Sequence, residues 1–226
     1  ALIKIIAVVV FILAIIFAVK QYMQDTNINS SSSSVSQNNQ NNIAGKSRAM
    51  NFSFLGSIYS VGYTIPKTNA QDFTSESYEW VKGGETVENW KTLITTHKLS
   101  PIDSSKPLTS SVYAQNVAAQ LKSKGAVLIE TSVINDDSAK EAGIDTSNPP
   151  YLLVSMFPAD EQGLTEFDVQ KIQDSGKGEV LVTIYAEEKD FDMKHKDTRA
   201  AQISGFIGSD EYNKIRDEVI FSKFPY

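Results

Sequence analysis

The side chains that most often carry out catalysis are scarce in this chain of 226 residues. It has no cysteine and two histidines, His97 and His195. Neither histidine lies in a His-Glu-x-x-His motif or a similar metal-binding spacing, and no Gly-x-Ser-x-Gly turn presents a nucleophilic serine. We expect His97 to lie half-exposed on a sheet and His195 to lie in a solvated, charged loop. The sequence therefore predicts a protein that is not an enzyme.

Two glycine-containing segments and two acidic loops are the remaining candidates for ligand binding. The Gly-Lys-Gly at 176–178 lacks the Ser or Thr of a P-loop and is predicted to be a hairpin turn. Residues 205–209 present backbone amides before a helix, which ordinary helix entry explains. The cluster of Asn135, Asp136, Asp137 and Asp145 and the pair Asp190 and Asp192 lack the regular ligand spacing of a calcium-binding loop. We expect no metal and no cofactor.

The strongest signal in the sequence is an apolar segment near its start. Residues 5–19 are all apolar, and Lys4 and Lys20 flank them. A helix over residues 2–23 would be about 33 Å long, enough to cross a hydrocarbon core of roughly 30 Å with its lysines at the interfaces. We expect residues 1–25 to form a helix that enters a membrane or a bundle of like helices.

The residues around this segment favour a retained anchor. A cleaved signal peptide needs small residues at a cleavage site just after the apolar core, and none stand there. A lipoprotein would need a cysteine. The sequence predicts an inner-membrane anchor with Lys4 on the cytoplasmic side and the rest of the chain outside the cytoplasm.

An apolar helix that begins at Ala1, without an initiator methionine, also resembles the mature subunits of type IV pilin-like filaments. The resemblance implies that a leader is removed and that the helices pack into the core of a filament at the cell surface. The chain departs from the family at Ile5, where most such subunits have a glutamate, and excision of methionine before Ala1 explains the start equally well. The small side chains form a narrow face for close approach of helices. The residues expected to matter for assembly are Ala1, Lys4, Ile5, Ala7, Ala14 and Ala18.

Residues 26–45 are mostly Ser, Asn and Gln and are expected to form a flexible linker, because this composition cannot bury enough apolar surface to order itself. Residues 46–226 are expected to form one α+β domain with an antiparallel sheet of five or six strands and two helices on one face. The order of elements is similar to that of Mog1/PsbP-like domains. The expected strands cover 51–65, 77–81, 91–99, 126–134, 151–157, 167–172 and 179–185, and the expected helices cover 108–124 and 209–220.

The aromatic residues allow two interpretations. They pack in the core, or, where the tail is exposed, they form a docking surface for a neighbouring subunit. The residues concerned are Trp80, Trp90, Phe221, Phe224 and Tyr226.

Charge and hydropathy together limit the function classes. A net charge of −6 argues against a nucleic-acid partner, since phosphate binding needs clustered Lys and Arg. The leading hypothesis is a non-enzymatic structural subunit that assembles with copies of itself or other envelope proteins through its N-terminal helix. The alternative is a membrane-tethered, monomeric periplasmic binding module or chaperone, and an anchored hydrolase is a third and weaker hypothesis.

Overall fold

The computed structural model describes residues 51–69, 73–135, 137–141, 143–145, 147–157, 165–191 and 195–226. The expected N-terminal helix, the expected linker and the six assembly residues in the helix lie outside these ranges. Within the described ranges, no helix combines the length and the apolar character needed to cross a membrane.

Eight strands and four helices make up the described part of the chain, so the predicted α+β class is confirmed. The strands are β1 (Asn51–Phe54), β2 (Ser57–Asn69), β3 (Phe73–Lys82), β4 (Thr92–Pro101), β5 (Val127–Val133), β6 (Tyr151–Met156), β7 (Thr165–Asp174) and β8 (Val180–Lys189). The helices are α2 (Ser110–Ser123), α3 (Asp137–Glu141), α4 (Lys196–Ile207) and α5 (Asp210–Phe221).

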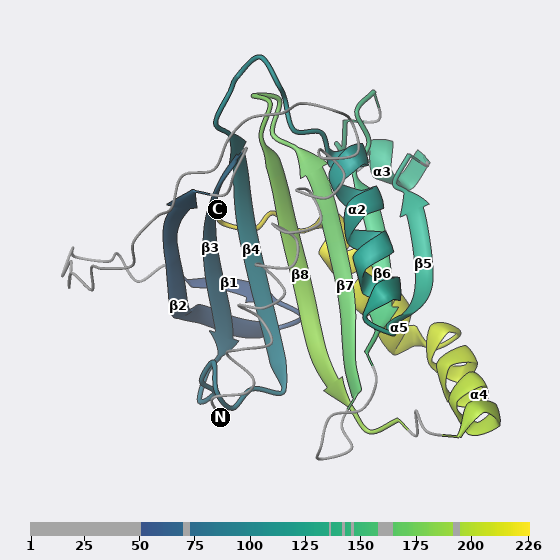
Figure 1. Ribbon diagram of the computed structural model, residues 1–226. Coiled ribbons are helices and arrows are strands. Elements are labelled where there is room, and N and C mark those ends of the chain that lie inside the picture. Colours follow the sequence, from purple (N-terminus) through teal and green to yellow (C-terminus); the bar gives the residue numbers. More distant parts are fainter. Residues whose placement is uncertain are drawn as a thin grey trace.

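All eight strands form one antiparallel sheet in the order β1-β2-β3-β4-β8-β7-β6-β5 (Figure 1). The expected antiparallel sheet is confirmed, but the expected number of five or six strands is wrong. Pairing of β4 with β8 joins the first four strands to the last four, so every predicted strand segment enters the same sheet.

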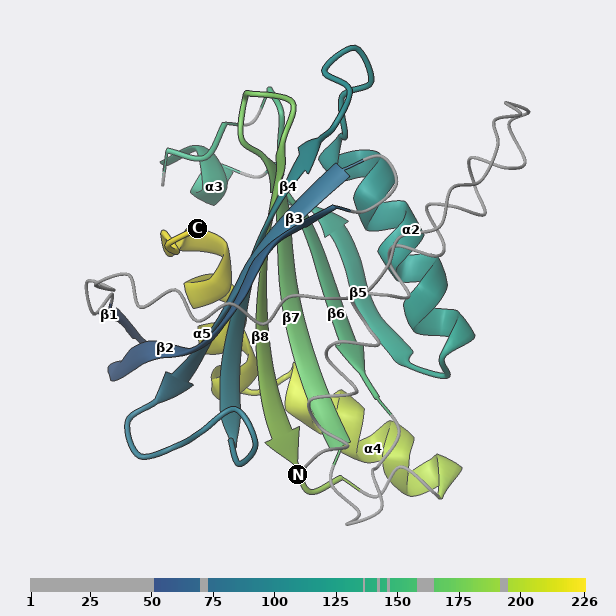
Figure 2. The same cartoon turned by 60° about the vertical axis from the view of Figure 1, so that its left-hand side comes forward.

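The helices cover both faces of the sheet, and the expectation of two helices on one face is wrong (Figure 2). We call these faces the α2 face and the α5 face. On the α2 face, Tyr113, Val117 and Leu121 pack with the side chains of β6, β7 and β8. On the α5 face, α5 packs on β7 through residues such as Val219. Because β6 is apolar on both sides, with Leu152 facing one cluster and Leu153 the other, both faces need a cover.

The two expected helices are confirmed, and each begins at a residue whose side chain caps it. The Thr109 side chain accepts a hydrogen bond from the Val112 amide at 3.4 Å, and Ser209 accepts one from the Tyr212 amide at 3.1 Å. Residues 190–199 were expected to be a charged loop, but α4 already begins at Lys196. Its sequence contains few apolar residues, and its main packing partner is α5, so local periodicity gives little signal for it.

Strand β2 runs past Pro66, where the sequence predicted it would end. Its pairing with β3 shifts register between Ile65 and Thr68, and this irregularity accommodates a residue that has no backbone N–H to donate. The part of β2 beyond β1 is an edge of the sheet, and Pro66 and Lys67 on it oppose pairing with another chain.

Candidate functional site

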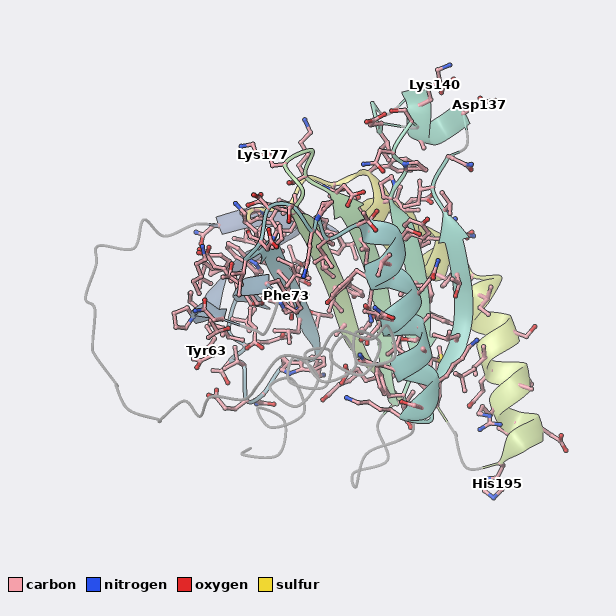
Figure 3. All side chains as sticks on the ribbon, turned by 45° about the horizontal axis from the view of Figure 1, so that its top comes forward. Tyr63, Phe73, Asp137, Lys140, Lys177 and His195 are labelled. Carbon is pink, nitrogen blue, oxygen red and sulfur yellow. The ribbon has the colours of Figure 1, made fainter. Side chains whose placement is uncertain are left out.

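The charged candidates from the sequence lie apart from one another on the surface. Lys177 is at the tip of the turn between β7 and β8, Asp137 begins α3, and His195 precedes α4 at the opposite end of the molecule (Figure 3). The predicted hairpin turn is confirmed, with Gly176 and Gly178 at φ of 77° and 72°, a conformation that favours glycine. The structure brings none of these residues together into a site.

Most of the aromatic residues that could have formed a docking surface are part of the core instead. Trp80 and Trp90 are buried, and Phe224 is only 8% exposed. Tyr226 is half-buried, and its hydroxyl lies 2.6 Å from the Thr183 hydroxyl. Among these five aromatic residues, only Phe221 presents a large exposed surface, at 40%.

His97 is the one expected surface histidine that the structure places in the interior. Its side chain is 4% exposed, and Nδ1 lies 2.6 Å from the Ser77 hydroxyl. Burial lowers the pKa of His97 to about 4, so the imidazole is neutral at neutral pH. A serine and a neutral imidazole are two parts of a hydrolytic triad, but within the described ranges no carboxylate hydrogen-bonds to His97 to orient it.

The strand register extends this pair into a belt of buried polar side chains across the α2 face. Ser77 pairs with His97, and Glu79 pairs with Thr95. Thr95 and Gln170 are both paired with Ile184 of β8, one from each side, so further polar residues of the same face lie on β7 beyond an apolar position of β8. The polar belt consists of Ser77, Glu79, Thr95, His97, Ser155, Asp168 and Gln170, all of them buried.

On β4, the polar residues Thr95 and His97 lie between two apolar clusters of the same face. Leu99 and Val182 belong to the cluster beneath α2, whereas Leu93 and Ala186 belong to a smaller cluster around Trp90. A continuous apolar face would pack at least as well, because burying polar groups costs free energy unless they find hydrogen-bond partners. The belt is therefore the part of the interior that packing alone does not explain.

At the β6–β7 end, several atoms of the belt lack hydrogen-bond partners among the described residues. They are Ser155 Oγ, Asp168 Oδ1 and Gln170 Nε2, together with both amide atoms of Gln120 on α2. Ser155 lies directly opposite Asp168 in the β6–β7 register. Buried polar atoms almost always have partners in folded proteins, so these five atoms are where a bound water or ligand would find unused hydrogen-bonding groups.

Two acidic groups of the belt are held in an unusual electrostatic environment. Burial, followed by repulsion from Glu88, raises the pKa of Glu79 to about 7. Burial also raises the pKa of Asp168 well above its usual range, and the neighbouring carboxyl of Glu166 adds to this rise. Both effects disfavour a bare negative charge in the belt.

A concave feature lies on the α5 face, between the edge strand β5 and α4. It is an open, mostly apolar groove with a volume of about 410 Å³. Its lining residues are Val127, Arg199, Ala200, Ile203, Ser204 and Ile207. Its lining contains no carboxylate or histidine that could act as a general base beside Arg199 and Ser204.

The polar belt was not predicted from the sequence, because its residues come from several strands. Asp168 and Gln170 alternate with apolar residues in a segment that reads as an ordinary half-buried strand, whereas the structure buries both faces. The signal available in the sequence is the polar side chains at alternate positions of β3, β4 and β7, which are inner strands of the sheet.

Comparison of the chain with known protein families, with curated proteins and with solved structures found no match. In the described part of the chain, no three His, Asp or Glu side chains are grouped so that they could hold a metal ion by themselves. The fold and the site therefore define an α+β domain with a polar interior belt.

Proposed function

We propose that this chain is a non-enzymatic, extracytoplasmic structural subunit that assembles through its N-terminal hydrophobic helix, in a pilin-like filament or an envelope complex. The observation that carries the proposal is the uninterrupted apolar run at residues 5–19, followed by a polar linker. A helix that is apolar on all sides needs lipid or like helices around it. Its partners are copies of the chain, other envelope proteins and the lipid bilayer.

The described domain supports this division of roles. Apolar clusters on both faces of its sheet are built from residues of the domain, from Phe54 to Phe224. Because the domain has its own hydrophobic core, the N-terminal helix can serve anchoring and assembly alone.

The cysteine-free sequence allows a clean crosslinking test of assembly. In a helix, Ala14 lies on the face that also holds Ala7 and Ala18, and Ile16 lies about 200° away from it. We expect the single-cysteine variant Ala14→Cys to form disulfide-linked dimers in oxidised membranes, because small residues let helices approach closely. The matched variant Ile16→Cys should crosslink much less. Equal crosslinking of both variants, or none, would contradict assembly through this face.

The orientation of the chain across the membrane is tested separately. Protease added to intact spheroplasts should release a fragment that begins near residue 45, because the linker is then outside the cytoplasm. A protected domain would overturn the extracytoplasmic location.

A second candidate function, a membrane-tethered monomeric binding module, is favoured by the unpartnered atoms of the polar belt. Release of the domain by protease, combined with only monomers in detergent and no crosslinks at Ala14, would support this function over assembly.

A further inference from the structure

The unpartnered atoms beneath α2 carry an inference that is independent of the N-terminal segment. Ser155 and Asp168 are register partners on β6 and β7 and point to the same face, and Gln170 is the next residue of β7 on that face. Gln120 belongs to the buried stripe of α2, which packs against β5, β6 and β7. These four side chains are each at most 8% exposed, so bulk water does not satisfy them.

The atoms that lack partners include three oxygens, which are Asp168 Oδ1, Ser155 Oγ and Gln120 Oε1. A second carboxyl, that of Glu166, is hydrogen-bonded to Asp168. Two carboxyl groups held side by side repel each other unless a proton or a cation lies between them. Carboxylate, hydroxyl and amide oxygens are the donor set that hard cations prefer, and sulfur or imidazole ligands are not among them.

The strands on either side of Asp168 place small residues next to it. Ala186 is the register partner of Asp168 on β8, and Ser155 is its partner on β6, so small side chains flank it on both sides. The amide groups of Gln120 and Gln170 provide N–H donors that can hold carboxylate oxygens in place, as outer partners do around metal ligands.

We propose that Gln120, Ser155, Glu166 and Asp168 form a binding site for a calcium ion between α2 and the β6–β7 strands. The two carboxylates neutralise the charge of the ion, and the neutral oxygens of Ser155 and Gln120 add further ligands. Calcium accepts such a mixed set with irregular geometry, whereas magnesium requires a near-ideal octahedron and retains several waters. The ligands come from three separate elements, so no contiguous sequence motif announces the site.

The test uses the full chain in detergent, stripped of metal with a chelator and then dialysed. We expect about 5 mM calcium, a concentration that saturates weak extracellular sites, to raise the melting temperature and to give a binding isotherm by calorimetry. Asp168→Asn should abolish this response, because it removes a charged oxygen ligand. Ser155→Ala should weaken calcium binding by roughly tenfold while the fold is retained.

The control variant is Asp217→Asn, which changes an exposed carboxylate on α5 and should leave the calcium response intact. A wild-type protein that shows neither a shift nor binding heat with calcium would overturn the proposal. An equal shift with sodium or magnesium, or an unchanged calcium response in both Asp168→Asn and Ser155→Ala, would also overturn it. Should Asp168→Asn not fold, Ser155→Ala and the calorimetry decide. None of these outcomes bears on assembly through the N-terminal helix.

Discussion

At the scale of single residues, Lys171 is a buried cation held by the end of a helix. Its Nζ donates to the Ile220 carbonyl at 2.8 Å and to the Ser222 carbonyl at 3.2 Å, at the C-terminus of α5. The negative end of the helix dipole lies there, which favours a positive charge. Burial nevertheless lowers the pKa of Lys171 to about 8.

This lowered pKa predicts a rise in stability at alkaline pH. An unfolded lysine keeps its proton up to about pH 10.5, whereas the folded protein releases it near pH 8, so the unfolded state binds more protons between these values. The free energy of unfolding should therefore rise with pH in this window, by at most about 3 kcal/mol. Lys171→Met should lose this rise, as measured by urea unfolding between about pH 7.5 and 9.5. The exposed Lys177→Met serves as the control, and equal slopes in both variants would refute the argument.

Glu79 predicts the opposite trend in a lower pH window. Its folded pKa of about 7 lies above the ordinary value of 4.5, so the folded state binds more protons between these values and stability falls as pH rises. Glu79→Gln should be more stable than wild type at pH 7.5, and its free energy of unfolding should vary less from about pH 5 to 7.5, because the titrating carboxyl is gone. Asp168 is present in both proteins, so its contribution cancels in the comparison. Glu141→Gln, at an exposed site in α3, should match wild type. A Glu79→Gln variant that is less stable at both ends of the window would contradict the assignment.

At the scale of elements, Gly62 permits the close approach of β2 to β3 and the loop after it. A Cβ atom at this position would lie 2.9 Å from Val81 Cγ2 and 3.0 Å from Val87 Cγ1. The β2–β3 register shifts between Val61 and Tyr63, at Gly62 itself. The missing side chain thus lets the irregular part of β2 lie against its neighbours.

Gly62→Ala should destabilise the domain by about 1–3 kcal/mol, the usual range for overpacking. Combination with Val81→Ala should cost less than the sum of the two single changes, because the second change removes the atoms that the new Cβ meets. Denaturant unfolding of the four proteins in this cycle measures the coupling. Gly205→Ala in α4, where nothing lies within 4 Å of the added atom, should be neutral or stabilising. If the losses in unfolding free energy from the Gly62 and Val81 changes simply added, the new Cβ atom would be accommodated by movement of other residues.

The elements also show what the sequence can and cannot predict. Helix α2 and helix α5 were predictable because their signals are local, from the Thr109 and Ser209 caps to the apolar stripe. The joining of β4 to β8 and the burial of His97 depend on contacts between residues about 85 positions apart, which no local pattern contains. The set around Asp168 was missed for the same reason, since its members come from separate elements.

At the scale of the whole molecule, the first strand and the last residues of the chain meet in one aromatic cluster. The Phe224 ring lies 5.7 Å from Phe52 and 5.5 Å from Phe54, between ring centroids, and Phe52 contacts Trp80 at 5.1 Å. The C-terminal tail thus crosses from α5 to the side of β1 and β3 (Figure 1).

This closure predicts that Phe224 stabilises the entire domain. Phe224→Ala should lower the free energy of unfolding by about 3–5 kcal/mol, as for other buried phenylalanines. The neighbouring Phe221→Ala, at an exposed position, should lower it by well under half as much. Urea unfolding followed by tryptophan fluorescence is suited to the comparison, because Trp80 belongs to the same cluster. Equal losses in the two variants would show that the tail does not lock the domain.

The same closure determines how the domain would respond to mechanical force. A pull away from the sheet that enters through residue 50 acts first on β1, whose four residues pair only with β2 in the described sheet. Such a load separates the paired residues of β1 and β2 one pair after another, and each pair alone offers little resistance. The rings of Phe52 and Phe54 must then be extracted from beside Phe224 before tension reaches β3 and the rest of the sheet. The aromatic contact between the two ends of the domain therefore works as a mechanical clamp at the point where a load from the proposed N-terminal anchor would enter.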